Sequence, residues 1–306
     1  MNRTLVSLTI AALLCTAASA VNAQQAFKTP DEAASALVSA AKTGDRKAIV
    51  LVLGPDGSDI VSSGDEVADA ATREKFVAAY DTKHQIAMDS ENKATVVIGP
   101  EDFPLPIPLV RKDGMWRFDT TAGRAEILAR RIGKNELDTI QACLAYVDAQ
   151  NDYADKDRTG AGKNLYAQHF VSSPGKKDGL YWPDAQGNDP SPLGEFFAEA
   201  AKQGYRVGGG RTPYHGYYYK ILTKQGAAAP DGELEYVVKG KMIGGFALVA
   251  YPAEYRNSGV MTFIVNHNGQ IYQKDLGPHT ARLAERMTSY NPDVTWTKVD
   301  VPPPTQ

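Results

Sequence analysis

The sequence predicts an α+β fold built from two parts. The first part would be N-terminal helices followed by a small antiparallel sheet, and the second a long helix packed on another antiparallel sheet. In both halves, apolar residues at helical spacing precede short β-branched or aromatic runs. Asp113-Gly114 and Asn268-Gly269 lie between such runs, and these dipeptides favour two-residue hairpin turns. Antiparallel pairing of neighbouring strands is therefore expected in each half.

Residues 1–23 have the pattern of a signal peptide. Arg3 supplies a positive charge, Leu5–Ala18 is apolar, and Val21-Asn22-Ala23 offers the small residues of a cleavage site. The apolar run is shorter than the about 20 residues that a permanent membrane span needs. We expect cleavage after Ala23 and a mature chain in the periplasm.

The two cysteines suit this expectation. Cys15 does not indicate a lipoprotein, because Leu14 stands where that motif has a small residue. Export would leave Cys143 as the only thiol, so no intramolecular disulfide is expected.

Residues 24–122 are expected to form the first domain. Thr29 and Pro30 suit the start of a helix that Gly44 would end, and two more helices follow, the last ending near Tyr80. The predicted strands are 94–98, 109–112 and 115–118, with the proline-rich residues 103–108 extended at the sheet edge. This order of elements is similar to that of the NTF2-like modules of exported proteins.

Residues 123–300 are expected to form the second domain, with residues 301–306 as a disordered tail. Helices are predicted over 121–132 and from Asn135 to Asp152, with a break at Gly133, and a short one over 193–202. Strands follow at 217–222, 262–266 and 270–272, the last two joined by Asn268-Gly269.

Several motifs spread over this half resemble one family. They are YVDAQNDY at 146–153, DGLYWP at 178–183, GYYYKIL at 216–222, FALVAYPAEY at 246–255 and the stretch 259–277. Together they resemble the exported bacterial family called domain of unknown function 2950, DUF2950. That resemblance implies a place outside the cytoplasm and no established activity.

A second resemblance concerns fold alone. Ala149, Gln150 and Tyr153 match an Ala-Gln-x-x-Tyr-like element that precedes the sheet in the globular heads of type IV pilins and pseudopilins. The chain departs from them in its cleavable signal and its preceding domain. Fibre assembly through a pilin-type N-terminal helix is therefore not expected.

Composition and spacing argue against most catalytic and cofactor chemistries. A net charge of −3 and a pI near 6.0 give no reason to expect a nucleic-acid partner. The five histidines lack metal-ligand spacing, and Cys143 lies in the middle of a helix beside its apolar stripe. We expect no cofactor and no metal site, and no catalytic residue is identified.

The aromatic residues offer a candidate binding surface. Nine of the fifteen tyrosines lie between Gly204 and Gly277. Rigid rings with polar tips, together with guanidinium groups, suit sugars, peptides or protein partners. The alternative is that alternating tyrosines fill one face of a half-buried sheet. The candidate surface comprises Trp182, Arg211, Tyr217, Tyr219, Tyr251, Tyr255 and Arg256.

These observations favour a non-catalytic binding or interaction module of the periplasm. Its partner would be an envelope protein, peptidoglycan or polysaccharide. One alternative is a periplasmic hydrolase whose site gathers His215, Asp275 and His279. Another is an accessory protein of a surface appendage, which rests on the pilin-like features.

Overall fold

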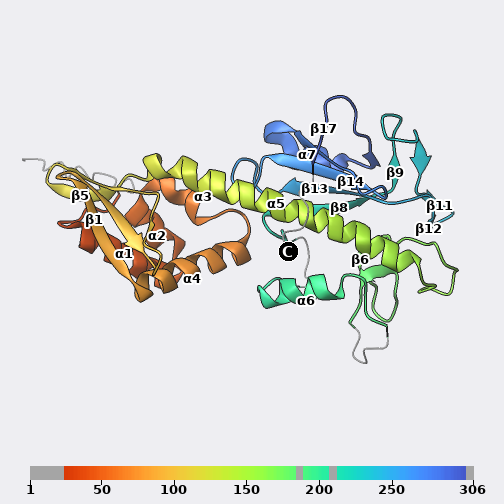
Figure 1. Cartoon of the computed structure of the whole chain (residues 1–306), viewed down its shortest axis with the longest axis horizontal. Coiled ribbons are helices and arrows are strands. Elements are labelled where there is room, and N and C mark those ends of the chain that lie inside the picture. The colour runs from red at the N-terminus through yellow and green to blue at the C-terminus, as the bar shows by residue number, and fades with distance from the viewer. Residues whose placement is uncertain (1–23, 184–188, 207–211, 301–306) are drawn as a thin grey trace, which may run out of the picture.

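The computed structural model describes residues 24–183, 189–206 and 212–300. The predicted signal peptide (1–23) and the predicted tail (301–306) lie outside the described residues. The protein is α+β, as the sequence predicts, with antiparallel sheets in two units. Figure 1 shows the units following one another along the long axis, with helix α5 (Thr120–Ala154) running through both.

The first helices begin and end at the capping residues that the sequence indicates. The Thr29 hydroxyl accepts the Glu32 amide at 3.1 Å and starts α1 (Pro30–Thr43), which ends at Gly44 with φ 69°. The other elements before the sheet are α2 (Arg46–Leu53), η1 (Pro55–Gly57), α3 (Ser58–Val61) and α4 (Glu66–Thr82).

The first sheet contains the predicted hairpin. Leu109 pairs with Phe118 and Lys112 with Met115, while Asp113 (φ 53°) and Gly114 (φ 77°) form the turn. Of the proline-rich residues 103–108, which the sequence predicts as extended, Phe103 and Pro104 form a strand that pairs with β2, whereas residues 106–107 form a bend. The sequence does not predict β1, because this strand is mostly exposed and lacks an alternation of apolar and polar residues. Its strands are β1 (His84–Ser90), β2 (Lys93–Ile98), β3 (Phe103–Pro104), β4 (Leu109–Lys112) and β5 (Met115–Phe118).

The predicted break at Gly133 is wrong, because α5 is one helix of 35 residues. Asp119 caps its start by accepting the Ala122 amide at 3.2 Å. Asn135, expected as a cap, lies inside the helix and donates through Nδ2 to the Ser258 carbonyl at 2.9 Å. A single glycine costs a helix only about 1 kcal/mol, which tertiary contacts on both sides of Gly133 outweigh.

The second unit is built on a five-stranded antiparallel sheet. Its order is β17 (Thr297–Lys298), β15 (Ile271–Asp275), β14 (Met261–Asn266), β13 (Ala247–Pro252) and β8 (Tyr217–Leu222). The predicted Asn268-Gly269 turn joins β14 to β15, and the Gly269 amide donates to Asn266 at 2.9 Å. Tyr219 reaches toward α5 whereas Lys220 bonds to the end of α7 (Thr280–Arg286), so these two helices cover opposite faces.

Smaller elements surround this sheet. Helix α6 (Gly194–Lys202) lies below α5 in Figure 1, next to the paired strands β6 (His169–Val171) and β7 (Gly179–Tyr181). The rest are β9 (Lys224–Gln225), β10 (Leu234–Glu235), β11 (Val237–Val238), β12 (Lys241–Met242), η2 (Gly277–His279) and β16 (Ser289–Tyr290).

Each unit has its own hydrophobic core. The first extends from Phe27 to Phe118 with Ile127 of α5 packed against it, and the second extends from Ile140 to Val299. The change from one core to the other therefore falls within α5, between Ile127 and Ile140, beyond the boundary at 122/123 that the sequence suggests. Among the helices of the described ranges, none has the length and apolar character needed to cross a bilayer.

Polar contacts join the two units beside α5. The Arg131 guanidinium donates to the Asp59 carbonyl at 2.7 Å and to the Asn257 side-chain oxygen at 2.6 Å. The Asn257 amide in turn donates to the Ser62 carbonyl at 2.7 Å. Because Asp59 and Ser62 belong to the first unit and Asn257 to the second, these bonds fix one unit against the other.

Candidate functional site: an aromatic cleft beside α5

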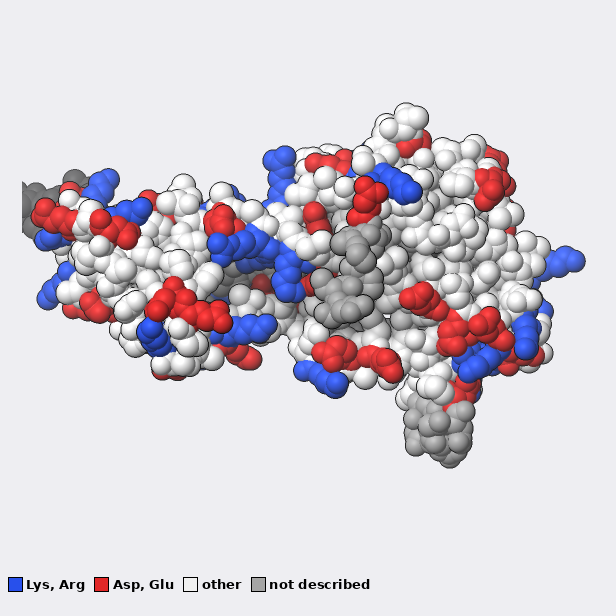
Figure 2. All heavy atoms as spheres, viewed as in Figure 1, with Lys and Arg blue, Asp and Glu red and all other residues white. Residues whose placement is uncertain are grey.

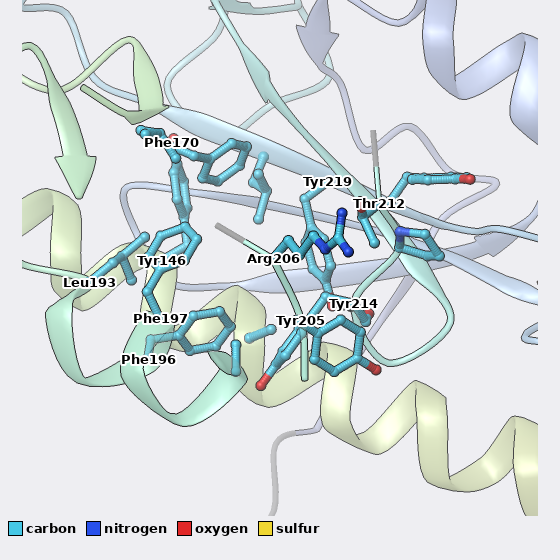
Figure 3. A pocket seen from close by; sticks show the side chains of 16 residues that line it. Tyr146, Phe170, Leu193, Phe196, Phe197, Tyr205, Arg206, Thr212, Tyr214 and Tyr219 are labelled. Carbon is cyan, nitrogen blue, oxygen red and sulfur yellow. Dashed lines mark hydrogen bonds between the residues drawn. The ribbon is translucent and has the colours of Figure 1, made fainter. Parts of the chain in front are cut away.

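A cleft of about 260 Å³ opens in the second unit between α5, α6 and the edge of the sheet at β8. Figure 3 shows rings from all of these elements turned toward one space. Its walls are mostly aromatic and aliphatic, and its polar groups are few. The lining residues include Tyr146, Phe170, Leu193, Phe196, Phe197, Tyr205, Arg206, Thr212, Tyr214 and Tyr219.

The rings of the cleft pack on one another. Phe196 and Tyr214 have ring centroids 4.9 Å apart, and Tyr205 and Tyr214 are also 4.9 Å apart. Phe197 packs against Tyr181 of β7 with ring centroids 4.6 Å apart and the rings tilted by 42°. Phe196, Phe197 and Tyr214 remain half-buried, so the cleft keeps apolar ring surface accessible. Such a preformed apolar concavity is typical of ligand sites.

The hydroxyls of two tyrosines in the wall already have protein partners. Tyr146 accepts from the Gln150 amide at 3.0 Å and donates to the Ala247 carbonyl at 3.3 Å. Tyr205 donates to Asp65 at 2.8 Å. These bonds hold the two buried rings in place and occupy their hydroxyls.

Arg206 is the charged residue among the described residues that line the cleft. Its side chain is exposed and makes no hydrogen bond or ion pair with the residues that the structure describes. In Figure 3 it extends across the cleft toward Thr212. A guanidinium next to apolar rings, with no partner in the described part of the chain, suits a ligand that carries an acidic group on an apolar body.

His215 lies just outside the cleft in a tight turn. His215 (φ 51°) and Gly216 (φ 75°) both have left-handed backbones, and Tyr214 and Tyr217 exchange backbone bonds across them at 2.9 and 3.1 Å. The His215 Nδ1 lies 3.3 Å from Asp138. Burial lowers the pKa of His215, although the charge of Asp138 opposes this shift.

Trp182 is a buried residue with polar and charged neighbours. Its ring is 5 % exposed and lies between Arg158 and Lys177, whose charged groups are 5.1 and 5.3 Å from the ring centroid. Its indole N–H donates to the Asp189 carbonyl at 3.0 Å. Lys177 and Arg158 also bond to the Asp189 carboxylate, and these bonds and charges hold its pKa below the usual range.

Tyr217 and Tyr251 are core residues of the sheet. Tyr217 is fully buried on the α5 side, and its hydroxyl donates to the Met261 carbonyl at 3.0 Å. Tyr251 is 2 % exposed and packs against Tyr218 on the opposite face, with the two rings tilted by 46°. For these two tyrosines the alternative interpretation, filling of a half-buried sheet, describes the structure.

The other members of the predicted surface are dispersed. Tyr219 is half-buried and lines the aromatic cleft. Within the described ranges it is the one residue of the predicted binding surface that also belongs to the cleft. Tyr255 donates to Asp275 at 3.0 Å, and the exposed Arg256 lies 5.5 Å over the Tyr255 ring. Arg211 lies outside the described residues.

The residues of the predicted hydrolase site have different contact partners in the structure. His215 contacts Asp138 and Tyr205, whereas Asp275 bonds to Tyr255 and to the Gly277 amide. Burial raises the pKa of the Cys143 thiol to about 12, which makes it a poor nucleophile. Among the described residues, no group of acidic, histidine or cysteine side chains has the arrangement of a metal site.

Sequence reasoning missed most of the cleft. Phe196, Phe197 and Tyr205 belong to a predicted helix and the loop after it. The available signal was two adjacent phenylalanines on a short helix: only one face of so short a helix can be buried on the sheet, so two neighbouring rings point to a second apolar contact.

Comparison with known proteins identifies a family and no activity. The family model described as "Protein of unknown function (DUF2950)" matches residues 24–299. No curated protein matches the chain. No solved structure matches it either, so the pilin-head resemblance is not confirmed. The match covers both units and the helix between them, and the protein therefore belongs to the DUF2950 family.

Proposed function

We propose that this protein is an exported, non-catalytic binding module of the bacterial cell envelope. The observation that carries the proposal is the aromatic cleft between α5, α6 and β8, with Arg206 at its side. Its ligand is an apolar segment of another envelope protein that also carries an acidic group.

Apolar ring surface favours a peptide over a glycan. A sugar brings many hydroxyls, each of which costs free energy when it is buried without a hydrogen-bond partner. The cleft offers few such partners, because Tyr146 and Tyr205 already use their hydroxyls on protein groups. An aromatic or aliphatic side chain loses nothing of this kind and gains about 25 cal/mol for each Å² removed from water.

The acidic character of the ligand follows from Arg206. Its guanidinium has no partner among the residues that the structure describes, and a carboxylate can accept two of its N–H groups at once. On the face drawn in Figure 2, acidic and basic side chains are interspersed over both units. That mixture supports recognition of one localised group over adsorption to a broad charged surface.

Export is supported by the N-terminal pattern of Arg3, the apolar run and the small residues before Gln24. Fractionation of cells that express the chain, followed by N-terminal sequencing, tests this part. A mature N-terminus at Gln24 in the periplasmic fraction is the expected result. Full-length chain retained in the cytoplasm would contradict it.

Binding is tested with a displayed library of random peptides selected on the wild-type protein. Selected peptides should combine an aromatic or aliphatic residue with an aspartate or glutamate. Phe197→Ala and Arg206→Glu should each weaken their binding at least about tenfold, since loss of a buried ring or a charged contact is worth about 2 kcal/mol. Lys202→Glu is the matched control, because Lys202 is exposed on α6 and is paired with Glu199.

Two results would refute this function. One is selection of peptides without any shared apolar or acidic residue. The other is binding that Phe197→Ala and Arg206→Glu leave unchanged. Retention of the protein on peptidoglycan or polysaccharide that these variants abolish would instead favour a glycan ligand.

A further inference from the structure

A second cavity opens in the first unit, and it shares no lining residue with the aromatic cleft among the described residues. It measures about 270 Å³ and is surrounded by α1, α2, α3, α4, β5 and the start of α5. Most of its wall is aliphatic or aromatic, with Leu37, Leu53, Ile107 and Phe118 each buried. Cavities of roughly 150 Å³ lined by such side chains hold a molecule the size of benzene, so this one accommodates a longer hydrocarbon.

The polar groups of this cavity gather on α4 and α5, but two of them are already bound. Asp69 accepts from the Ser63 amide at 3.0 Å and from the Ser63 hydroxyl at 2.7 Å. Arg131 donates to carbonyls of Asp59 and Ile60 and to Asn257. Their opposite charges also compensate each other within the unit.

Arg73 differs from these two residues. It is half-buried and lines the cavity, and its guanidinium lies against Gly44 at the end of α1. It forms no hydrogen bond or ion pair with any residue in the described ranges. Asp69, one turn earlier on α4, is directed to Ser63 and does not neutralise it.

We infer that this cavity binds a single-chain amphiphile with a carboxylate head, such as a medium-length fatty acid. The hydrocarbon chain fills the apolar interior between α1, α2 and β5. The carboxylate accepts hydrogen bonds from the Arg73 guanidinium. It thereby neutralises the positive charge of Arg73, which no acidic side chain of the described cavity lining pairs with. Charge complementarity thus selects an acid over an alcohol or an amine of equal length.

The inference is tested by calorimetric titration of the whole mature chain with sodium decanoate, below the concentration at which decanoate forms micelles. Octanoate and 1-decanol serve as comparison ligands. Decanoate, which has two more methylene groups than octanoate, should bind roughly tenfold more tightly, because each buried CH₂ contributes about 0.8 kcal/mol. 1-Decanol should bind more weakly than decanoate, because it cannot form the ionic contact.

Variants locate the site. Arg73→Gln should weaken decanoate at least about tenfold and leave 1-decanol unchanged, because a charged hydrogen bond is lost while the apolar wall is kept. Lys75→Gln, on the same helix but outside the cavity lining, is the matched control and should bind decanoate like the wild type. Arg206→Glu in the aromatic cleft should also leave decanoate binding unchanged.

Three outcomes would overturn the inference. The first is no heat of decanoate binding to the wild type. The second is equal affinity of wild type and Arg73→Gln for decanoate. The third is decanoate binding that Arg206→Glu removes and Arg73→Gln keeps, which would move the acid to the aromatic cleft. A failure here leaves the peptide-binding function untouched, because that function is tested with different probes and variants.

Discussion

The carboxylate of Asp65 accepts a hydrogen bond of 2.8 Å from the hydroxyl of Tyr205, and this bond ties the start of α4 to the segment that follows α6. The same carboxylate accepts the Gly216 amide at 2.9 Å and caps α4 through the Ala68 amide at 3.0 Å. Asp65 is only 1 % exposed. One buried side chain therefore joins the first unit to the wall of the aromatic cleft.

Replacing Asp65 with alanine should lower the free energy of unfolding by about 4 kcal/mol, since a cap is lost and two buried donors are left unpaired. Tyr205→Phe removes only one of these bonds and should cost about 1 kcal/mol. Urea unfolding followed by circular dichroism measures both. Asp148→Ala is the control, because Asp148 is exposed on α5 and should change stability by less than about 0.5 kcal/mol. Equal effects at Asp65 and Asp148 would refute the assigned role.

Two glycines of α5 predict opposite effects of the same substitution. A Cβ at Gly123 would lie 2.4 Å from the Pro106 carbonyl oxygen and 2.8 Å from the Ile107 Cα. Gly123→Ala should therefore destabilise the protein by about 2 kcal/mol despite the better helix propensity of alanine. Gly133 has no heavy atom within 4 Å of such a Cβ, and Gly133→Ala should stabilise by about 1 kcal/mol.

Urea midpoints of the two variants and the wild type provide the measurement. The pair also tests the continuity of α5. If Gly133→Ala destabilised the protein, the helix would be interrupted there, as its sequence alone suggests.

Buried tyrosines predict loss of stability at high pH. Burial raises the pKa of Tyr214 and of Tyr236 to about 12, and it raises the pKa of Tyr146, Tyr205 and Tyr217 further. In the unfolded chain these groups ionise near pH 10. The unfolded state therefore releases protons first, so this contribution to stability is complete below about pH 10 and declines as the pH rises toward 12.

Each such tyrosine should cost about 1.4 kcal/mol for every pH unit in that window. Urea midpoints at about pH 8 and about pH 11, together with the phenolate absorbance, measure the effect. We expect late, cooperative ionisation that coincides with unfolding. Reversible ionisation of all the tyrosines near pH 10 in a folded protein would contradict the assigned burial.

The fold could be predicted largely because its information is local. Thr29 and Gly44 delimit α1, and Asp113-Gly114 and Asn268-Gly269 determine their hairpins within a few residues. The error at Gly133 arose because what holds the helix together there is distant: Asn135 bonds to Ser258. Local propensity gave no access to that contact.

The candidate site was harder to predict from the sequence, because it too depends on contacts between distant parts of the chain. Whether a tyrosine of β8 is buried depends on what covers it, and Gly259 leaves room for the Tyr217 ring from another part of the chain. Alternation along β8 correctly separates Tyr217 and Tyr219 from Tyr218 and Lys220. It does not reveal that Tyr219 ends beside α6 in an open cleft while Tyr217 is enclosed.

The central claim is that a protein partner occupies the aromatic cleft. The most direct measurement places the photoreactive amino acid p-benzoylphenylalanine at Thr212, which is exposed and lines the cleft, in cells that export the protein. Val294, fully exposed and outside the cleft lining, is the control position. We expect one discrete crosslinked envelope protein from position 212, none from position 294, and loss of the product with Arg206→Glu. The same products from both positions, or a product at 212 that Arg206→Glu leaves intact, would contradict it.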